Sequence, residues 1–143
     1  MKDELEIVLA MYKVQVARSE HYEGLRAALT NVILGLSAAL VALATFDNAL
    51  SFRDSWLGAV IMWLGVVGYI ASRLHSTRSS RHGHRAAAYR DMLDKLAPAA
   101  GINVVRQQVT QEPTRLNSVW SLVHLGVVAT GAIIVGLSLL SPV

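Results

Sequence analysis

Three long runs without Asp, Glu, Lys or Arg constrain this chain more than any other feature. They cover residues 27–46, 55–72 and 119–140. A helix of about 20 residues rises about 30 Å, the thickness of the hydrocarbon core of a bilayer. The runs are apolar around their whole circumference, which suits lipid-facing helices whose backbone groups bond to one another. We therefore predict an all-α integral membrane protein with three transmembrane helices. The alternative is a soluble bundle with buried helices.

The composition agrees with this prediction. Hydrophobic residues make up 53% of the chain and charged residues only 16%, whereas about 25% charged residues are usual in a soluble domain. The chain has no cysteine, which excludes disulfides, thiolate zinc sites and iron–sulfur clusters. The triplet Ala42-Leu43-Ala44 resembles a signal-peptide cleavage site, but the polar-rich stretch before the first run is too long, and we predict no cleavage there.

The basic residues predict an orientation. Residues 1–26 hold four Lys or Arg and residues 73–115 hold eight, whereas residues 47–54 hold only Arg53 and residues 141–143 none. Because cytoplasmic loops are enriched in Lys and Arg, the N-terminus and residues 73–118 are expected in the cytoplasm and the C-terminus outside. The expected location is the inner (plasma) membrane.

Both cytoplasmic segments carry helical patterns. Residues 1–26 place apolar or small side chains at helical spacing, and this helix is expected to continue into the first span; the residues are Leu5, Val8, Leu9, Tyr12, Val16 and Ser19. It could pack on another cytoplasmic helix or lie on the membrane surface.

Residues 73–118 form a basic region expected to begin as a continuation of the second span and to end at Pro98 and Gly101. Its apolar stripe contains Ala88, Tyr89, Met92, Leu93 and Leu96, and pairing within one chain or between subunits is possible. The pattern does not decide the structure of residues 98–117. Asn117 and Ser118 are a predicted N-cap for the third span.

Four arginines follow the second span closely, namely Arg73, Arg78, Arg81 and Arg85, with His75, His82 and His84 among them. Cations at this position anchor a helix to anionic headgroups, each gaining about 1 kcal/mol. The competing hypothesis is a site for an anionic ligand such as a nucleotide. A metal at His82 and His84 is not expected, because residues two apart lie on different faces of a helix.

Two polar residues fall inside the predicted spans. Asn31 and His124 lie at similar depths near the cytoplasmic ends of the first and third spans, so we predict that they can meet. They would form either an interhelical hydrogen bond or a pH-sensitive, pore-lining group.

Small residues four apart allow close helix contacts and are candidates for oligomer packing. The pairs are Gly35/Ala39, Ala38/Ala42, Gly126/Thr130 and Ala132/Gly136. No catalytic motif, phosphate-binding loop or metal motif is present, so we expect neither enzyme activity nor a cofactor nor a nucleic-acid partner.

The layout resembles a known family. The stretch MYKVQVARSEHYEGLRAALTNVILGLSAAL, followed by a second span that runs into RHGHRAAAYRDMLDKL, is similar to the SLATT family of small bacterial membrane effectors and to RipA-type bacterial membrane proteins. The likeness covers residues 8–97 and involves Tyr12, Arg18 and Tyr89. It implies a homo-oligomer that perforates the inner membrane in response to a nucleotide signal. The third span, residues 119–140, departs from the family.

These patterns support competing functions. The first is a homo-oligomeric, pore-forming or membrane-perturbing effector whose partners are lipids, other copies of itself and a cytoplasmic protein or nucleotide signal. The alternative is a non-conducting scaffold or accessory subunit that binds a larger partner through Tyr89, Met92, Leu93 and Leu96. A phage holin is a third possibility, in which the long cytoplasmic hairpin has no obvious role.

Overall fold

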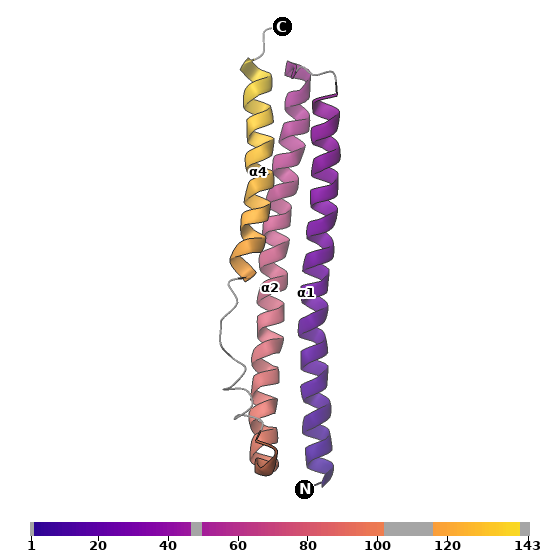
Figure 1. Ribbon diagram of the computed structural model, residues 1–143, viewed down its shortest axis with the longest axis vertical. Coiled ribbons are helices and arrows are strands. Elements are labelled where there is room, and N and C mark those ends of the chain that lie inside the picture. Colours follow the sequence, from indigo (N-terminus) through magenta and orange to yellow (C-terminus); the bar gives the residue numbers. More distant parts are fainter. Residues whose placement is uncertain (1, 47–49, 102–115, 141–143) are drawn as a thin grey trace. The chain divides into compact units, whose positions relative to one another are not determined.

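The computed structural model describes residues 2–46, 50–101 and 116–140, which form three long α-helices (Figure 1). These are α1 (Lys2–Ala44), α2 (Ser55–Leu96) and α4 (Leu116–Leu140), with 3-10 turns η1 (Phe52–Asp54) and η2 (Pro98–Ala100) at the two ends of α2. No strand occurs among the described residues, and all three helices are long and apolar enough to cross a membrane. The all-α prediction is therefore confirmed over the described part of the chain.

The helix ends follow local chemistry. α2 passes through Gly83 without a break and ends at Leu96, two residues before Pro98, which cannot continue the hydrogen-bonding ladder. Gly101 then adopts a left-handed conformation with φ of 58°, which glycine tolerates because it has no Cβ. α4 already begins at Leu116, so the predicted N-cap at Asn117 and Ser118 is wrong. Both residues lie in the first helical turn, where the backbone N–H groups have no partner within the helix and where Asn and Ser are better tolerated than in a helix interior.

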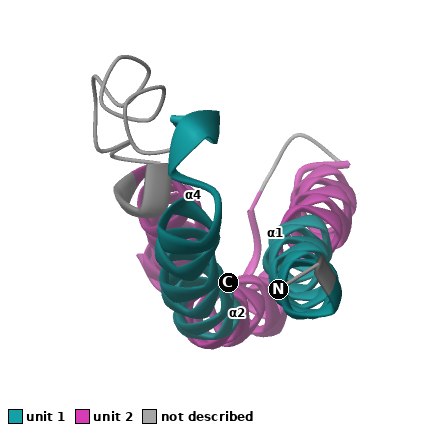
Figure 2. Cartoon of the chain, turned by 90° about the horizontal axis from the view of Figure 1, so that it is seen from below, with its two compact units in different colours: residues 1–25, 75–115 teal, residues 26–74, 116–143 magenta. Residues whose placement is uncertain are grey.

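The chain divides into two compact units (Figure 2). Unit 1 combines residues 1–25 with residues 75–115, and unit 2 combines residues 26–74 with residues 116–143. α1 and α2 each contribute one segment to each unit, whereas α4 belongs to unit 2 alone. The region 102–115, whose structure the sequence did not decide, lies outside the described residues.

Inward-facing positions on α2 follow alternating steps of three and four residues. In unit 2 these positions are buried, and in unit 1 they are buried or half-buried; the residues are Gly58, Ile61, Gly65, Gly68 and Ser72, then His75, Ser79, His82, Ala86, Tyr89, Leu93 and Leu96. This is the 3.5-residue repeat of a coiled-coil seam. The inward positions of α2 therefore follow the same spacing within each unit.

In unit 2, glycine lets α2 and α4 pack with their backbones almost in contact. A Cβ atom added to Gly131 would lie 2.6 Å from the carbonyl oxygen of Gly58, and one added to Gly65 would lie 2.8 Å from the backbone nitrogen of Val128. Real Cβ atoms do not come this close to backbone atoms. These glycines therefore set the separation of the two helices, as small residues do in membrane helix packing.

Apolar side chains fill the rest of unit 2. Its buried cluster draws on all three helices and consists of Ala44, Leu57, Ile61, Val127 and Ile134, with Leu40, Val41 and Leu50 packed against it. Most other large apolar side chains on these segments are exposed, among them Val32, Trp63 and Leu122. An exposed apolar surface of this kind suits a lipid environment.

In unit 1 the N-terminal segment of α1 packs on residues 75–96 of α2. The predicted inner face of this segment is largely confirmed, since Leu5, Val8 and Tyr12 are half-buried. Leu9 is the exception, with 39% of its surface exposed, because it lies about 100° around the helix from Val8. Gln15 is buried on the same face, and this introduces polar contacts into the packing.

The glycine contact predicts the effect of adding one methyl group. Gly131→Ala should destabilise the protein by about 1–3 kcal/mol, because the new Cβ overlaps the backbone of α2. Gly136→Ala is the matched control on the same helix, since a Cβ there meets nothing within 4 Å. Unfolding in detergent micelles would measure both variants, and equal destabilisation would contradict the close approach.

Candidate functional site

The polar centre of unit 2 is His124, whose side chain is fully buried. Its Nε2 atom lies 3.2 Å from the hydroxyl oxygen of Thr30, and its ring packs directly against Gly68. Residues of α1, α2 and α4 therefore meet at one imidazole. Gly68 allows this contact because a Cβ at that position would overlap the ring.

Hydrogen-bond counting assigns the tautomer of His124. The Thr30 hydroxyl donates its single hydrogen to the backbone oxygen of Arg26 at 2.9 Å, so it can only accept from His124. Nε2 is then the protonated nitrogen. Nδ1 is buried and has no hydrogen-bond partner among the described residues, which fits the bare acceptor nitrogen of a neutral ring.

The sequence predicted that Asn31 and His124 meet because they lie at similar depths, and this prediction is wrong. Asn31 is exposed, and Thr30 supplies the hydrogen bond instead. Successive helical residues point about 100° apart, so two neighbours at almost the same depth face different surroundings. The buried positions 26, 30, 33 and 37 of α1 include Thr30, but they form no apolar stripe in the sequence, so depth alone could not distinguish Thr30 from Asn31.

Arg26 lies at the start of the unit 2 segment of α1 and is only 6% exposed. Its guanidinium carbon is 5.4 Å from the centre of the Trp120 ring, a distance at which a cation is attracted to an aromatic face. Together with the bond from Thr30 to the Arg26 carbonyl, this contact links one turn of α1 to the beginning of α4.

Unit 1 is held by a polar seam between α1 and α2. The hydroxyls of Ser19 and Ser79 are 2.9 Å apart, and Ser79 donates to a carboxylate oxygen of Glu23 at 3.2 Å. One turn away, Nδ1 of His82 lies 2.8 Å from the side-chain oxygen of Gln15 and acts as the donor. The seam fixes the antiparallel register of the two segments, because each pair satisfies groups on opposite helices.

An aromatic cluster extends this seam. The ring of Tyr22 is stacked on that of His82 with centroids 5.6 Å apart, and the ring of His75 lies 6.1 Å from Tyr22 on α2. The guanidinium carbon of Arg78 is 5.8 Å from the Tyr22 centroid. His75, Arg78 and His82, which all follow the second apolar run, therefore surround the ring of Tyr22.

The four predicted anion-binding arginines, Arg73, Arg78, Arg81 and Arg85, are all exposed. The guanidinium group of Arg78 lies over the ring of Tyr22. His84 is exposed whereas His82 faces Gln15, as expected for residues two apart on a helix. Among the described residues no group of three or more His, Asp or Glu could hold a metal ion.

The predicted oligomer-packing residues divide into two sets. The small residues Gly35, Ala39, Gly126, Ala132 and Gly136 are all exposed, so none of them makes the close contacts inside the chain, which instead use Gly58, Gly65, Gly68 and Gly131. In the apolar stripe after the second span, Leu93 is buried, Tyr89 and Leu96 are half-buried, and Met92 is exposed. That stripe is used mainly within unit 1.

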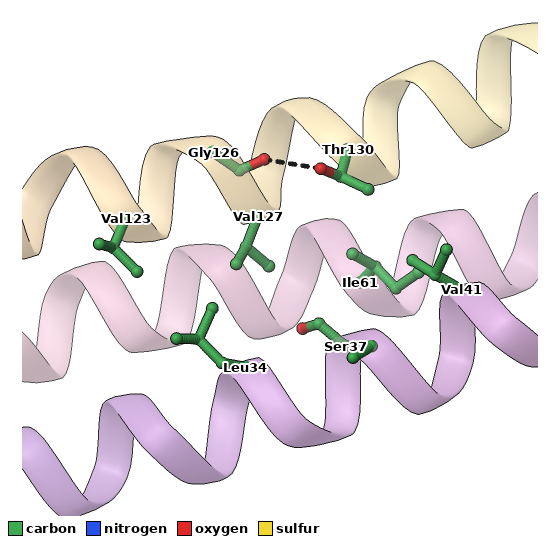
Figure 3. A pocket seen from close by; sticks show the side chains of 9 residues that line it. Leu34, Ser37, Val41, Ile61, Val123, Gly126, Val127 and Thr130 are labelled. Atoms are coloured by element: carbon green, nitrogen blue, oxygen red, sulfur yellow. Dashed lines mark hydrogen bonds between the residues drawn. The ribbon is translucent and has the colours of Figure 1, made fainter.

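A groove of about 300 Å³ opens between α1 and α4 in unit 2, with Ile61 of α2 at its floor (Figure 3). The small residues Ser37, Ala38 and Gly126 line its walls, together with Leu34, Val41, Val123, Val127 and Thr130. The hydroxyl of Thr130 is committed to the backbone oxygen of Gly126 at 3.0 Å. The hydroxyl of Ser37 is buried and has no hydrogen-bond partner among the described residues.

Comparison of the chain with family profiles, curated proteins and solved structures finds no match. The resemblance to the SLATT family therefore stays a prediction from the layout of the sequence.

The buried hydrogen bond predicts a difference between two neighbouring residues. Thr30→Val keeps the shape of the side chain but leaves His124 without its acceptor, and should cost about 0.6–2 kcal/mol of stability. Asn31→Val is the control, because Asn31 is exposed. The free energy of unfolding in mixed micelles should be lower for Thr30→Val than for Asn31→Val. A larger loss from Asn31→Val would contradict the hydrogen bond between Thr30 and His124.

The polar seam of unit 1 predicts a similar contrast. Ser79→Ala removes the group that joins Ser19 to Glu23 and should destabilise unit 1 by about 1–2 kcal/mol. Ser80→Ala, at the adjacent exposed position, should change stability by less than about 0.5 kcal/mol. Amide hydrogen exchange of residues 15–23 would measure this, and unchanged protection in Ser79→Ala would refute the role of the seam.

Proposed function

We propose that this protein is a small bacterial membrane protein that assembles with copies of itself in the inner membrane and perforates or perturbs the bilayer. In this proposal unit 2 lies in the bilayer and unit 1 in the cytoplasm, with the N-terminus inside and the C-terminus outside. The distribution of Lys and Arg supports this orientation. The exposed arginines 73, 78, 81 and 85 then lie where they attract anionic headgroups or an anionic signal.

The exposed small residues of α1 are the main support for self-assembly. α1 has a second seam at steps of three and four residues, and every position in it is exposed; the residues are Ala10, Val14, Ala17, His21, Gly24, Ala28, Asn31, Gly35, Ala38 and Ala42. Seven of these ten residues are Gly or Ala. Small residues at this period let two helix backbones approach closely, and this drives helix association where lipid offers no hydrophobic gain.

Exposed apolar residues near the N-terminus support the same conclusion. Ile7 and Met11 are 61% and 45% exposed in unit 1, which the proposal places in water. Large apolar side chains that gather on a water-exposed face mark a protein contact. A second copy of the chain would cover them while one of its helices packs along the small seam.

A scaffold is the second candidate, favoured by the same exposed residues. Met92, 52% exposed, together with Ile7 and Met11, could bind a larger cytoplasmic partner. The scaffold differs from the first proposal in one respect, because it predicts no effect on membrane potential when the protein is expressed alone.

Induced expression in bacteria tests the proposal. The protein should depolarise the membrane, as reported by a voltage-sensitive dye, and should be purified in detergent as a multiple of the 15.5 kDa chain mass. The double variant Ala28→Leu with Gly35→Leu fills the small seam and should abolish both results. Leu36→Phe, which adds bulk on another exposed face of α1, should leave both unchanged.

Two outcomes would refute the proposal. A monomeric protein in native mass spectrometry would exclude self-assembly. An oligomer that leaves the membrane potential unchanged would exclude perforation and favour the scaffold.

A further inference from the structure

The groove of unit 2 contains a polar atom that the chain does not satisfy. Ser37 lines the groove, is only 6% exposed, and its hydroxyl has no hydrogen-bond partner among the described residues (Figure 3). An unsatisfied buried hydroxyl costs free energy, so such a group usually has a partner. Hydrocarbon tails of lipids cannot provide one.

A second unsatisfied polar group lies on the opposite side of the same unit. Trp63 is 64% exposed and lies at the middle of the apolar run 55–72. Tryptophan prefers the membrane–water boundary, where its indole N–H finds water. In the hydrocarbon core the N–H is a donor without a partner. Trp63 is two positions from Ile61 along α2, so its side chain points away from the groove that Ile61 lines.

These two groups lie at the same depth. In unit 2, α1 and α2 run antiparallel, with the side chain of Ile33 at Gly68 and with Ala44 and Leu57 in one buried cluster. This register places Ser37 level with Leu64, about 1.5 Å along the helix axis from Trp63. Copies related by an axis along the membrane normal lie at equal depth, so Trp63 of one copy is level with Ser37 of the next.

We propose that the groove between α1 and α4 is the seat for Trp63 of a second copy of this chain, whose indole N–H donates to the Ser37 hydroxyl. This inference rests on the self-assembly proposed above and specifies its interface. An apolar cavity of about 150 Å³ accommodates benzene, so a groove of about 300 Å³ accommodates the larger indole. Small side chains at Ala38 and Gly126 leave the walls open to it.

The contact is heterologous, because it joins two different surfaces of the chain. Each copy offers Trp63 on one side and the groove on the other, so successive copies form a ring or an open row. A ring of copies joined by such contacts encloses a central space. A two-fold dimer, in which both copies use the same patch, encloses none.

Cysteine cross-linking tests the geometry directly, since the chain has no cysteine of its own. Leu34→Cys lies in the groove and Val66→Cys lies near Trp63 on α2, at nearly the same level. In native membranes the double variant should give a ladder of cross-linked copies under mild oxidation. Neither single variant should cross-link, because a heterologous contact never pairs a residue with itself.

The control pair is Leu36→Cys with Val66→Cys. Leu36 is 50% exposed and two residues from Leu34, on a different face of α1. This pair should give no ladder. A ladder from the control, or dimers from either single variant, would overturn the proposed interface.

A double-mutant cycle tests the hydrogen bond. Trp63→Phe keeps an aromatic ring without the N–H, and Ser37→Ala removes the acceptor. Each variant should weaken association by about threefold to tenfold, and the two together by no more than one alone. Ser37→Ala should not destabilise the monomer in detergent, because the hydroxyl has no partner within the described chain. If the two substitutions weakened association additively, the proposed hydrogen bond between Trp63 and Ser37 would be refuted.

Failure of this inference is distinguishable from failure of the proposed function. A monomer in native mass spectrometry would refute self-assembly, and this inference with it. An oligomer that shows no ladder from Leu34→Cys with Val66→Cys would refute only the Trp63 interface.

Discussion

The close approach of α2 to its neighbours is the constraint on which the rest of the structure depends. In a bilayer, lipid is as apolar as leucine, so helices gain little by hiding hydrophobic surface from it. Association then rests on van der Waals contact, which is lost within a fraction of an ångström. Gly58, Gly65 and Gly68 on α2, with Gly131 on α4, remove the side chains that would hold the backbones apart. The positions of the other side chains in unit 2 follow from this separation.

The inward positions of α2 differ in chemistry between the two units. They are mostly glycine in unit 2 and include His75, Ser79 and His82 in unit 1. A polar seam is tolerable there because Ser79 and His82 find hydrogen-bond partners on α1, Ser79 with Ser19 and Glu23 and His82 with Gln15. Polar pairs also specify register more sharply than apolar contacts, since a shifted helix leaves donors and acceptors unpaired. In unit 2 one such pair, Thr30 and His124, has this role.

The proposed function depends on the outer surface of the fold. Large apolar side chains cover most of unit 2 as lipid requires, but one exposed seam of α1 is composed mostly of Gly and Ala. Trp63 and Ser37 each carry a polar atom that lipid cannot satisfy. These are the places where the single chain is incomplete as a membrane protein. In the proposed assembly further copies cover all of these places, and this is why we attribute function to the assembled protein rather than to a pocket within one chain.

Much of the architecture could be predicted from the sequence. Three uncharged runs predicted three long helices, because an apolar helix satisfies its own backbone groups, and Pro98 determined the end of α2. The tertiary structure alone decided how each helix is rotated about its axis. That choice made Thr30 rather than Asn31 the partner of His124, and made Gly58, Gly65, Gly68 and Gly131 the contact glycines while Gly35, Gly126 and Gly136 stayed exposed. Runs apolar on every side carry no amphipathic stripe to show which face turns inward, so in unit 2 the steric fit between helices made this choice.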